Sequence, residues 1–151
     1  FTIDIPSTPA FQGWAFDSQT GTSVVSFDAI PSSLGIDGVI GLSTNLATEY
    51  DDLAVIVRFS EMGAIEARNG SDYMSDSMIS YIAGTCYHFE LVVDVEAHTY
   101  SAYVTPEGGS RLTIGENYTF RTTQAGADSL AYWNIVSSVG NFTISKFAIR
   151  K

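Results

Sequence analysis

The clearest pattern in the chain is an alternation of apolar and polar residues between Tyr87 and Thr105. Apolar side chains occupy every second position, first at Tyr87, Phe89, Leu91 and Val93, and then at Tyr100, Ala102 and Val104. Because successive side chains of a strand point to opposite faces, each half predicts a strand with one apolar and one mostly polar face. The short polar segment Glu96-Ala97-His98 between them predicts a hairpin turn.

Similar short alternating runs, separated by turn-forming Gly, Pro, Asn and Asp residues, continue along the rest of the chain. They predict strands over residues 1–5, 14–16, 23–29, 38–43, 53–59, 64–68, 72–74, 78–82, 111–114, 117–121, 130–136 and 141–149. Segments 45–52 and 122–129 are predicted loops, each with room for one helical turn. No long stretch has the apolar spacing of an amphipathic helix, so the pattern indicates an all-β, antiparallel β-sandwich.

The length of 151 residues and the hydrophobic content of 45% fit one domain with a core of its own, over residues 1–151. We find no internal repeat and no linker-like tract. The longest apolar runs are too short to span a bilayer. Because the chain begins with Phe1, we interpret it as a domain excised from a larger secreted multidomain protein.

The formal net charge of −10, with only 7 Lys and Arg residues, argues against partners that need a basic surface. Nucleic acids and anionic membranes are therefore excluded as expected partners. A local basic site remains compatible with this charge. Cys86 is the single cysteine, so no disulfide can form within the chain, and we expect a monomeric module.

The order of the predicted elements resembles that of a known fold family. The resemblance rests on residues 25–31 (Val-Ser-Phe-Asp-Ala-Ile-Pro), 37–43 (Asp-Gly-Val-Ile-Gly-Leu-Ser), 57–59, 63–65, 83–89, 93–94, 98–104 and 140–144. This run is similar to concanavalin A-like jelly rolls, including the LamG-type and lectin-like carbohydrate-binding modules appended to secreted polysaccharide-degrading enzymes. The resemblance implies two curved sheets, an extracellular location, and a polysaccharide or oligosaccharide partner on the concave sheet face.

The most specific candidate site combines residues on the polar faces of several predicted strands, namely Arg58, Arg68, His88, Glu90 and Tyr103. If those strands are neighbours, the five side chains converge on one sheet face. Paired guanidinium donors suit the carboxylate or sulfate of an acidic sugar. The alternative is that the two arginines form ordinary cross-strand ion pairs with Glu66 and Glu90.

A second candidate site is built around Trp133, an aromatic ring that could stack on a sugar. Asn134 beside it and Gln124 upstream could hydrogen-bond to sugar hydroxyls. The alternative is that Trp133 belongs to the core, as single aromatic residues in sandwich strands often do. An acidic glycan and a neutral one therefore both remain open as ligands.

Acidic residues in predicted turns could hold a structural Ca²⁺, since calcium prefers carboxylate and carbonyl oxygens. They are Asp17, Asp28, Asp37, Asp51, Asp52, Asp72 and Asp76. No EF-hand loop is present, so no ligands can be assigned, and a solvated acidic surface is the alternative. The sequons at Asn69, Asn117 and Asn141 could carry glycans in a eukaryotic secreted protein.

The sequence lacks the motifs of familiar hydrolases. A lectin-like glucanase would need a Glu-x-Asp-x-x-Glu strand, and that motif is absent. The alternative enzyme is a small polysaccharide lyase, in which Arg58 or Arg68 neutralises a uronate, His88 abstracts a proton and Tyr103 supplies one. The predicted function is therefore a non-catalytic carbohydrate-binding module, with a lyase or a structural adhesion domain without a sugar ligand as alternatives.

Overall fold

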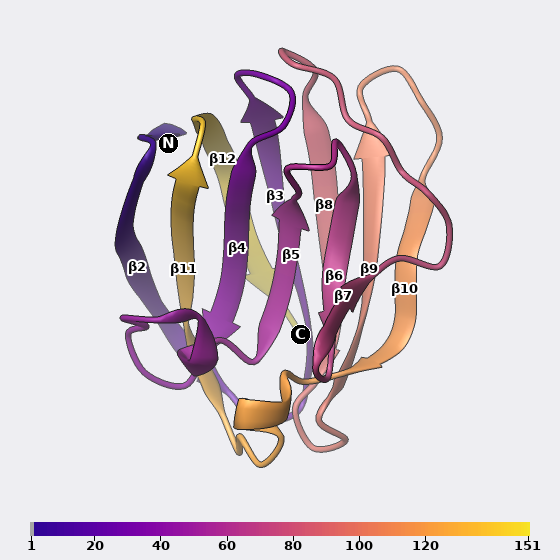
Figure 1. Ribbon diagram of the computed structural model, residues 1–151. Helices are drawn as coiled ribbons and strands as arrows, with labels where there is room; N and C mark the ends of the chain where they lie inside the picture. The colour runs from indigo at the N-terminus through magenta and orange to yellow at the C-terminus, as the bar shows by residue number, and fades with distance from the viewer. Residues whose placement is uncertain (1) are drawn as a thin grey trace.

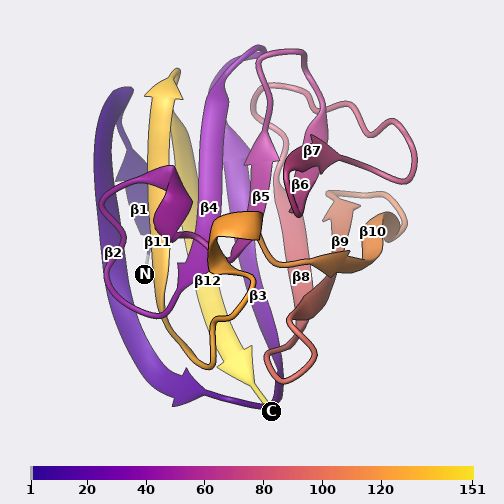
Figure 2. The ribbon, with the colours of Figure 1, turned by 60° about the horizontal axis from the view of Figure 1, so that its bottom comes forward.

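The computed structural model describes residues 2–151 as two antiparallel sheets of six strands that face each other (Figures 1 and 2). Sheet I contains, in spatial order, β1 (Thr2–Ile5), β12 (Phe142–Arg150), β3 (Thr22–Pro31), β8 (Tyr87–Asp94), β9 (Thr99–Pro106) and β10 (Leu112–Thr119). Sheet II contains β2 (Thr8–Gln19), β11 (Leu130–Val139), β4 (Asp37–Ser43), β5 (Val55–Phe59), β6 (Ile65–Asn69) and β7 (Asp72–Met74). The predicted all-β, antiparallel sandwich is confirmed. Phe1, which we assigned to the first strand, lies outside the described residues.

The predicted hairpin is present as β8 and β9, with Phe89 opposite Val104 and a turn over residues 95–98. Its apolar positions are buried between the sheets, whereas His88 and Glu90 point outward. His98 closes the turn with a φ of 57°, a left-handed conformation that short polar turns use. The alternation of the sequence therefore identified the inner face of this hairpin correctly.

Four predicted strands differ from the structure. β2 runs over 12 residues instead of three, because its edge position lets it tolerate Pro9 and Gly13. The segments 111–114 and 117–121 form one bulged strand, β10, in which a Cβ at Gly115 would lie 2.1 Å from the Tyr118 ring. Segment 78–82 is not a strand and contributes only the isolated bridge between Ala64 and Ser80.

Aromatic side chains form the centre of the core between the two sheets. The Phe59 ring, on β5, makes edge contacts at centroid distances of 5.0–6.1 Å with Tyr81, Tyr87, Phe89 and Phe142. Phe27 stacks on Phe89 within sheet I at 5.1 Å. Rings of both sheets thus interdigitate and fix how the two layers lie on each other.

A smaller apolar cluster lies on the outer face of sheet II, where segment 44–52 folds over the strands. Its buried members are Val39, Ala47, Leu53, Ile56 and Val136. The close approach of this segment requires glycine beneath it, because a Cβ at Gly13 would lie 2.5 Å from the Leu46 side chain. This covering segment forms one wall of the site described below.

Two short 3₁₀ helices, η1 (Tyr50–Asp52) and η2 (Thr122–Gln124), meet at one end of sheet II (Figure 2). They match the two helical turns that the sequence allowed. The Thr123 hydroxyl and the Gln124 amide both donate to the Asp51 carbonyl, at 2.8 and 2.9 Å. None of the helices in residues 2–151 is long and apolar enough to cross a membrane.

Candidate functional site

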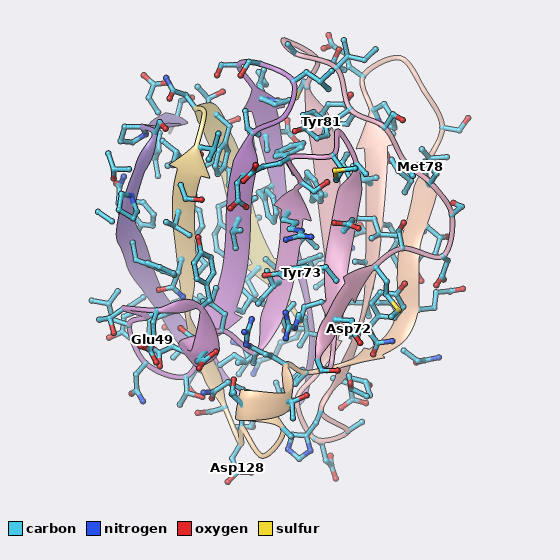
Figure 3. All side chains as sticks on the ribbon, in the orientation of Figure 1. Glu49, Asp72, Tyr73, Met78, Tyr81 and Asp128 are labelled. Carbon is cyan, nitrogen blue, oxygen red and sulfur yellow. The ribbon has the colours of Figure 1, made fainter. Side chains whose placement is uncertain are left out.

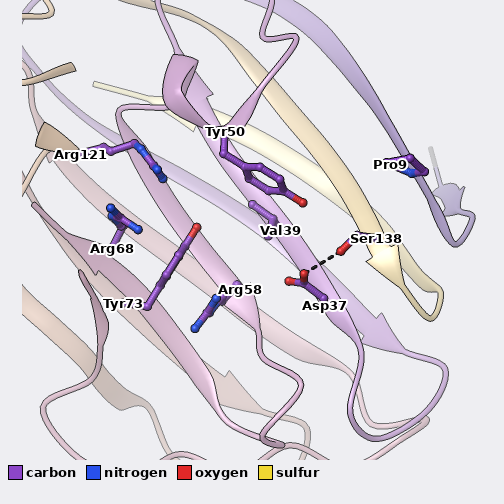
Figure 4. Close-up of a pocket in the computed structure, with 9 residues that line it drawn as sticks. All are labelled: Pro9, Asp37, Val39, Tyr50, Arg58, Arg68, Tyr73, Arg121 and Ser138. Carbon is purple, nitrogen blue, oxygen red and sulfur yellow. Dashed lines mark hydrogen bonds between the residues drawn. The ribbon is translucent and has the colours of Figure 1, made fainter. Parts of the chain in front are cut away.

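A pocket of about 420 Å³ opens on the outer face of sheet II, away from the sandwich core (Figure 4). One of its lining residues, Tyr73, is labelled in Figure 3. It is lined by Pro9, Asp37, Val39, Tyr50, Arg58, Arg68, Tyr73, Arg121 and Ser138, and we call it the arginine pocket. Three of the seven basic residues of this acidic chain line it. This concentration of positive charge makes it the best candidate site for an anionic ligand.

Two of these arginines lie against the ring of Tyr73, which β7 contributes. The guanidinium carbon of Arg58 is 3.6 Å from the ring centroid, and that of Arg68 is 5.0 Å away. Figure 4 shows the ring edge-on with one arginine on each side. Because both ring faces are occupied, Tyr73 cannot stack on a sugar, and it acts instead as a spacer that orients two cations.

The three arginines differ in how far the protein already satisfies them. Arg58 donates to Glu66 from Nε and Nη2 at 3.0 and 2.8 Å, as the ion-pair alternative predicted. Arg121 pairs with Asp51 at 3.0 Å. Arg68 donates only Nε to the Gly70 carbonyl, at 3.0 Å, and within residues 2–151 no carboxylate lies in ion-pair range of it. Arg68 therefore has the most donor capacity left for a ligand.

Tyr50 and Tyr73 stand on two sides of the pocket (Figure 4). Burial raises the pKa of both phenols above the ordinary value, and for Tyr73 the nearby Arg58 only partly opposes this effect. Both hydroxyls therefore stay protonated at neutral pH. They can donate hydrogen bonds to a ligand, but they are poor proton acceptors.

The expected convergence of five residues on one sheet face was wrong. Arg58 and Arg68 lie on β5 and β6 of sheet II, whereas His88, Glu90 and Tyr103 lie on β8 and β9 of sheet I. Each set points outward from its own sheet, so the sandwich core separates them. Alternation along a strand shows which side faces the core, but it does not show to which of two sheets the strand belongs.

The outer face of sheet I is a network of ion pairs. His88 Nδ1 lies 2.6 Å from Asp28, and Lys146 lies 3.7 Å from the same carboxylate. Glu90 pairs with Arg111 at 3.1 Å and with Arg150 at 3.8 Å. Tyr103 donates to Glu116 at 3.0 Å, and Arg111 lies over its ring at 3.7 Å. The predicted residues on this face already have protein partners.

The expectation that Trp133 offers a stacking platform was also wrong. Its ring is 4% exposed and stacks between Trp14, at 4.7 Å, and Phe147, at 4.1 Å. It joins the two sheets on the inner side of β11, so the core alternative holds. Burying a large apolar ring stabilises the fold, because it removes apolar surface from water.

The side-chain amides of Asn134 and Gln124 form hydrogen bonds within the protein and are not available to a sugar. The Asn134 amide oxygen accepts the Ala47 N–H at 3.0 Å, and its nitrogen donates to the Ser43 hydroxyl at 2.8 Å. Asn134 thereby anchors the covering segment 44–52. Gln124 fastens η2 to η1 through Asp51. Neither residue lines the arginine pocket.

Sequence reasoning missed Arg121, Tyr50 and Asp37 as members of this site, although Asp37 was noted as a turn carboxylate. Arg121 follows β10 and is held by its backbone N–H, which donates to the Ala54 carbonyl at 2.9 Å. The scarcity of basic residues was an available signal, since any arginine in this chain is unusual. The position of Arg121 beside Arg58 and Arg68 depends on contacts between segments that are distant in the sequence.

The carboxylates considered for calcium have mostly local partners, such as Arg121 for Asp51 and the Tyr118 hydroxyl for Asp76. Residues 2–151 contain no group of three or more His, Cys, Asp or Glu side chains that could hold a metal ion. Carbonyl oxygens also bind calcium, so a structural Ca²⁺ stays a prediction.

No known protein-family profile matches the chain. A gellan lyase from Bacillus sp. is 30% identical over 100 residues, which are 64% of this chain and 4% of that enzyme. The chain therefore corresponds to a small part of this much longer relative.

Solved structures with the same arrangement of strands include enzymes and lectins. A sialidase matches 99% of this chain and 15% of its own with a TM-score of 0.71 and 13% identity. The catalytic domain of a GH131 β-glucanase from Podospora anserina gives 0.64 at 8% identity, over 99% of this chain and 71% of its own. Lectin I-B4 from Griffonia simplicifolia gives 0.59 at 12% identity, over 97% and 84% of the two chains. The predicted concanavalin A-like, lectin-like jelly roll is thus confirmed as the fold.

Proposed function

We propose that the chain is a non-catalytic carbohydrate-binding module that holds an acidic, uronate-containing polysaccharide in the arginine pocket. The observation that carries this proposal is the meeting of Arg58, Arg68 and Arg121 in one hollow of a protein with a net charge of −10. Guanidinium groups bind carboxylates through paired, planar donors. In this proposal the chain works outside the cell, as a module of a longer protein.

The comparisons support this proposal at the level of fold and ligand class. Lectins share the strand arrangement, and the relative of related sequence is named for its action on gellan, a polysaccharide. Because the match covers 4% of that enzyme, an accessory role beside a separate catalytic domain fits this chain better than the whole reaction.

A polysaccharide lyase is the second candidate, favoured by the likeness to gellan lyase. The catalytic set that we considered is not assembled, since His88 and Tyr103 lie on the sheet opposite Arg58 and Arg68. A lyase would therefore need a base from the pocket itself, where the Asp37 carboxylate already accepts from Ser138 and burial raises the pKa of the Tyr50 and Tyr73 phenols. The pocket geometry thus favours binding over elimination.

A structural or adhesion domain is the third candidate. Exposed apolar side chains, Leu34, Met62 and Ile82, occur in loops at one end of the sandwich. These loops meet where the Tyr81 N–H donates to the Gly63 carbonyl, at 3.2 Å. Exposed apolar groups of this kind can mark a contact with another protein.

The proposal is tested by retention on immobilised gellan, alginate, polygalacturonate and neutral β-glucan, with and without a calcium chelator. We expect retention on an acidic polysaccharide that Arg68→Gln weakens and that Arg111→Gln does not. Arg111 is a matched control, because it also lies over a tyrosine ring, that of Tyr103, but on the outer face of sheet I. Absence of retention on every polysaccharide would reject the proposal, and new absorbance from unsaturated sugar ends would establish the lyase instead. Loss of retention in chelator would support the structural Ca²⁺.

A further inference from the structure

The arginine pocket has two chemically different ends. Figure 4 shows Asp37 and Ser138 at one end, Arg68 and Arg121 at the other, and Val39 between them. The Ser138 hydroxyl donates to Asp37 at 2.6 Å, which leaves acceptor capacity on this carboxylate. The pocket therefore offers acceptors at one end and donors at the other.

The donor end contains hydrogen-bonding groups that the described protein does not satisfy. The terminal nitrogens of Arg68 have no hydrogen-bond acceptor within residues 2–151. Arg121 Nε is buried and has no hydrogen-bond acceptor among the described residues. Buried donors without a partner are rare and costly, and the terminal nitrogens of the half-buried Arg68 are the unpartnered donors that line the pocket.

The middle of the pocket suits one sugar ring. Val39 gives a small apolar floor, and the Tyr50 and Tyr73 side chains border it on two sides (Figure 4). The volume of about 420 Å³ lies in the lower part of the range for ligand sites and leaves little space for a long chain segment. Recognition through charge is favoured over stacking, because Arg58 and Arg68 cover both faces of Tyr73.

We propose, building on the function proposed above, that the pocket is a subsite for a single uronate ring of the polysaccharide. The sugar carboxylate is held by Arg68 and Arg121, and the hydroxyls on the opposite edge donate to Asp37 and meet Ser138. A uronate carries one acid group and several hydroxyls, which matches the two ends. A sugar with sulfate groups on both edges would place an anion beside Asp37, where like charges repel.

The test compares an acidic polysaccharide that the protein retains with its carboxyl-reduced form, in which each –CO₂⁻ becomes –CH₂OH. We expect reduction to weaken wild-type binding by about ten- to a hundredfold, the range for lost hydrogen bonds to a charged group. Arg68→Gln should bind both forms equally weakly, whereas Arg111→Gln should keep the wild-type difference. Circular dichroism would verify that each variant is folded.

Each other outcome overturns a defined part of the proposal. Equal binding of the reduced form would reject the carboxylate subsite and leave polysaccharide binding standing. Equally tight binding of dextran sulfate would show a general anion site, and tighter binding of polysialic acid than of any uronate polymer would replace uronate with another carboxylated sugar. No binding of any glycan would reject the subsite together with the proposed function.

Discussion

The guanidinium of Arg58 lies flat over the ring of Tyr73, with its central carbon 3.6 Å from the ring centroid. The same arginine is held from the side by Glu66, its neighbour across β5 and β6. This contact fixes the centre of the arginine pocket before any ligand binds. Donors that are already oriented reduce the entropy lost when the ligand binds. The Tyr73 ring therefore contributes to binding by orienting the arginines, although it does not stack on the ligand.

Tyr73→Ala should therefore weaken binding of an acidic polysaccharide, although it removes no charge. A cation–π contact at a half-buried site is worth about 0.5–2 kcal/mol, so we expect a loss of about two- to thirtyfold. Tyr73→Phe retains the ring and loses only the hydroxyl, so it should bind more tightly than Tyr73→Ala. Isothermal titration calorimetry would measure both variants. Equal affinity of wild type and Tyr73→Ala would show that the ring does not position the arginines.

Trp133→Ala should act on stability and not on ligand recognition. The Trp133 ring is stacked between Trp14 and Phe147 inside the sandwich, and removing a buried ring of this size costs about 3–5 kcal/mol. Urea unfolding would measure the change, with Trp133→Phe as the milder control. A stable Trp133→Ala protein that no longer binds a neutral glycan would instead restore Trp133 as a binding residue.

Stability should fall at high pH because of Tyr118. Burial, helped by the hydrogen bond to Asp76 at 2.9 Å, raises the pKa of Tyr118 to about 12. The unfolded chain loses this proton from about pH 10 upward, while the folded chain keeps it. The contribution of Tyr118 to stability is therefore full below about pH 10 and declines as the pH rises toward 12. Urea unfolding between about pH 8 and 11.5 should show a shallower decline for Tyr118→Phe. Identical slopes in the two proteins would contradict this assignment.

Binding should not respond to the titration of histidine. Arginines stay charged across the accessible range, and His88 lies on the opposite sheet beside Asp28. We expect constant affinity for a uronate polymer between about pH 5.5 and 8.5, and weaker binding below about pH 4, where uronate carboxylates gain protons. His88→Ala should give the same profile. A change in affinity within this range that disappears in His88→Ala would place the ligand on sheet I.

The sequence predicted local features of this protein well, because they depend on neighbouring residues. The alternation at Tyr87, Phe89, Leu91 and Val93 identified the buried face of β8, and the loops around η1 and η2 were placed correctly. Turn chemistry and the period of two residues carry this information directly.

The candidate site was harder to predict, because it depends on which strands share a sheet. β6 and β8 are close in sequence but belong to different sheets, so Arg68 and His88 face opposite sides of the molecule. Trp133 and Asn134 are adjacent on β11, and nothing local shows which of them faces the core. Arg121 was predicted to end the strand 117–121, but β10 ends at Thr119 and Arg121 enters the pocket from the loop that follows.

The most direct test of the central claim is a titration of the ¹⁵N-labelled protein with an acidic oligosaccharide, followed by amide chemical shifts. We predict that the perturbed amides cluster around Val39, Arg68 and Tyr73 on sheet II, and that those around Glu90 and Tyr103 on sheet I do not move. Perturbations confined to the outer face of sheet I would contradict the assignment of the binding site to the arginine pocket.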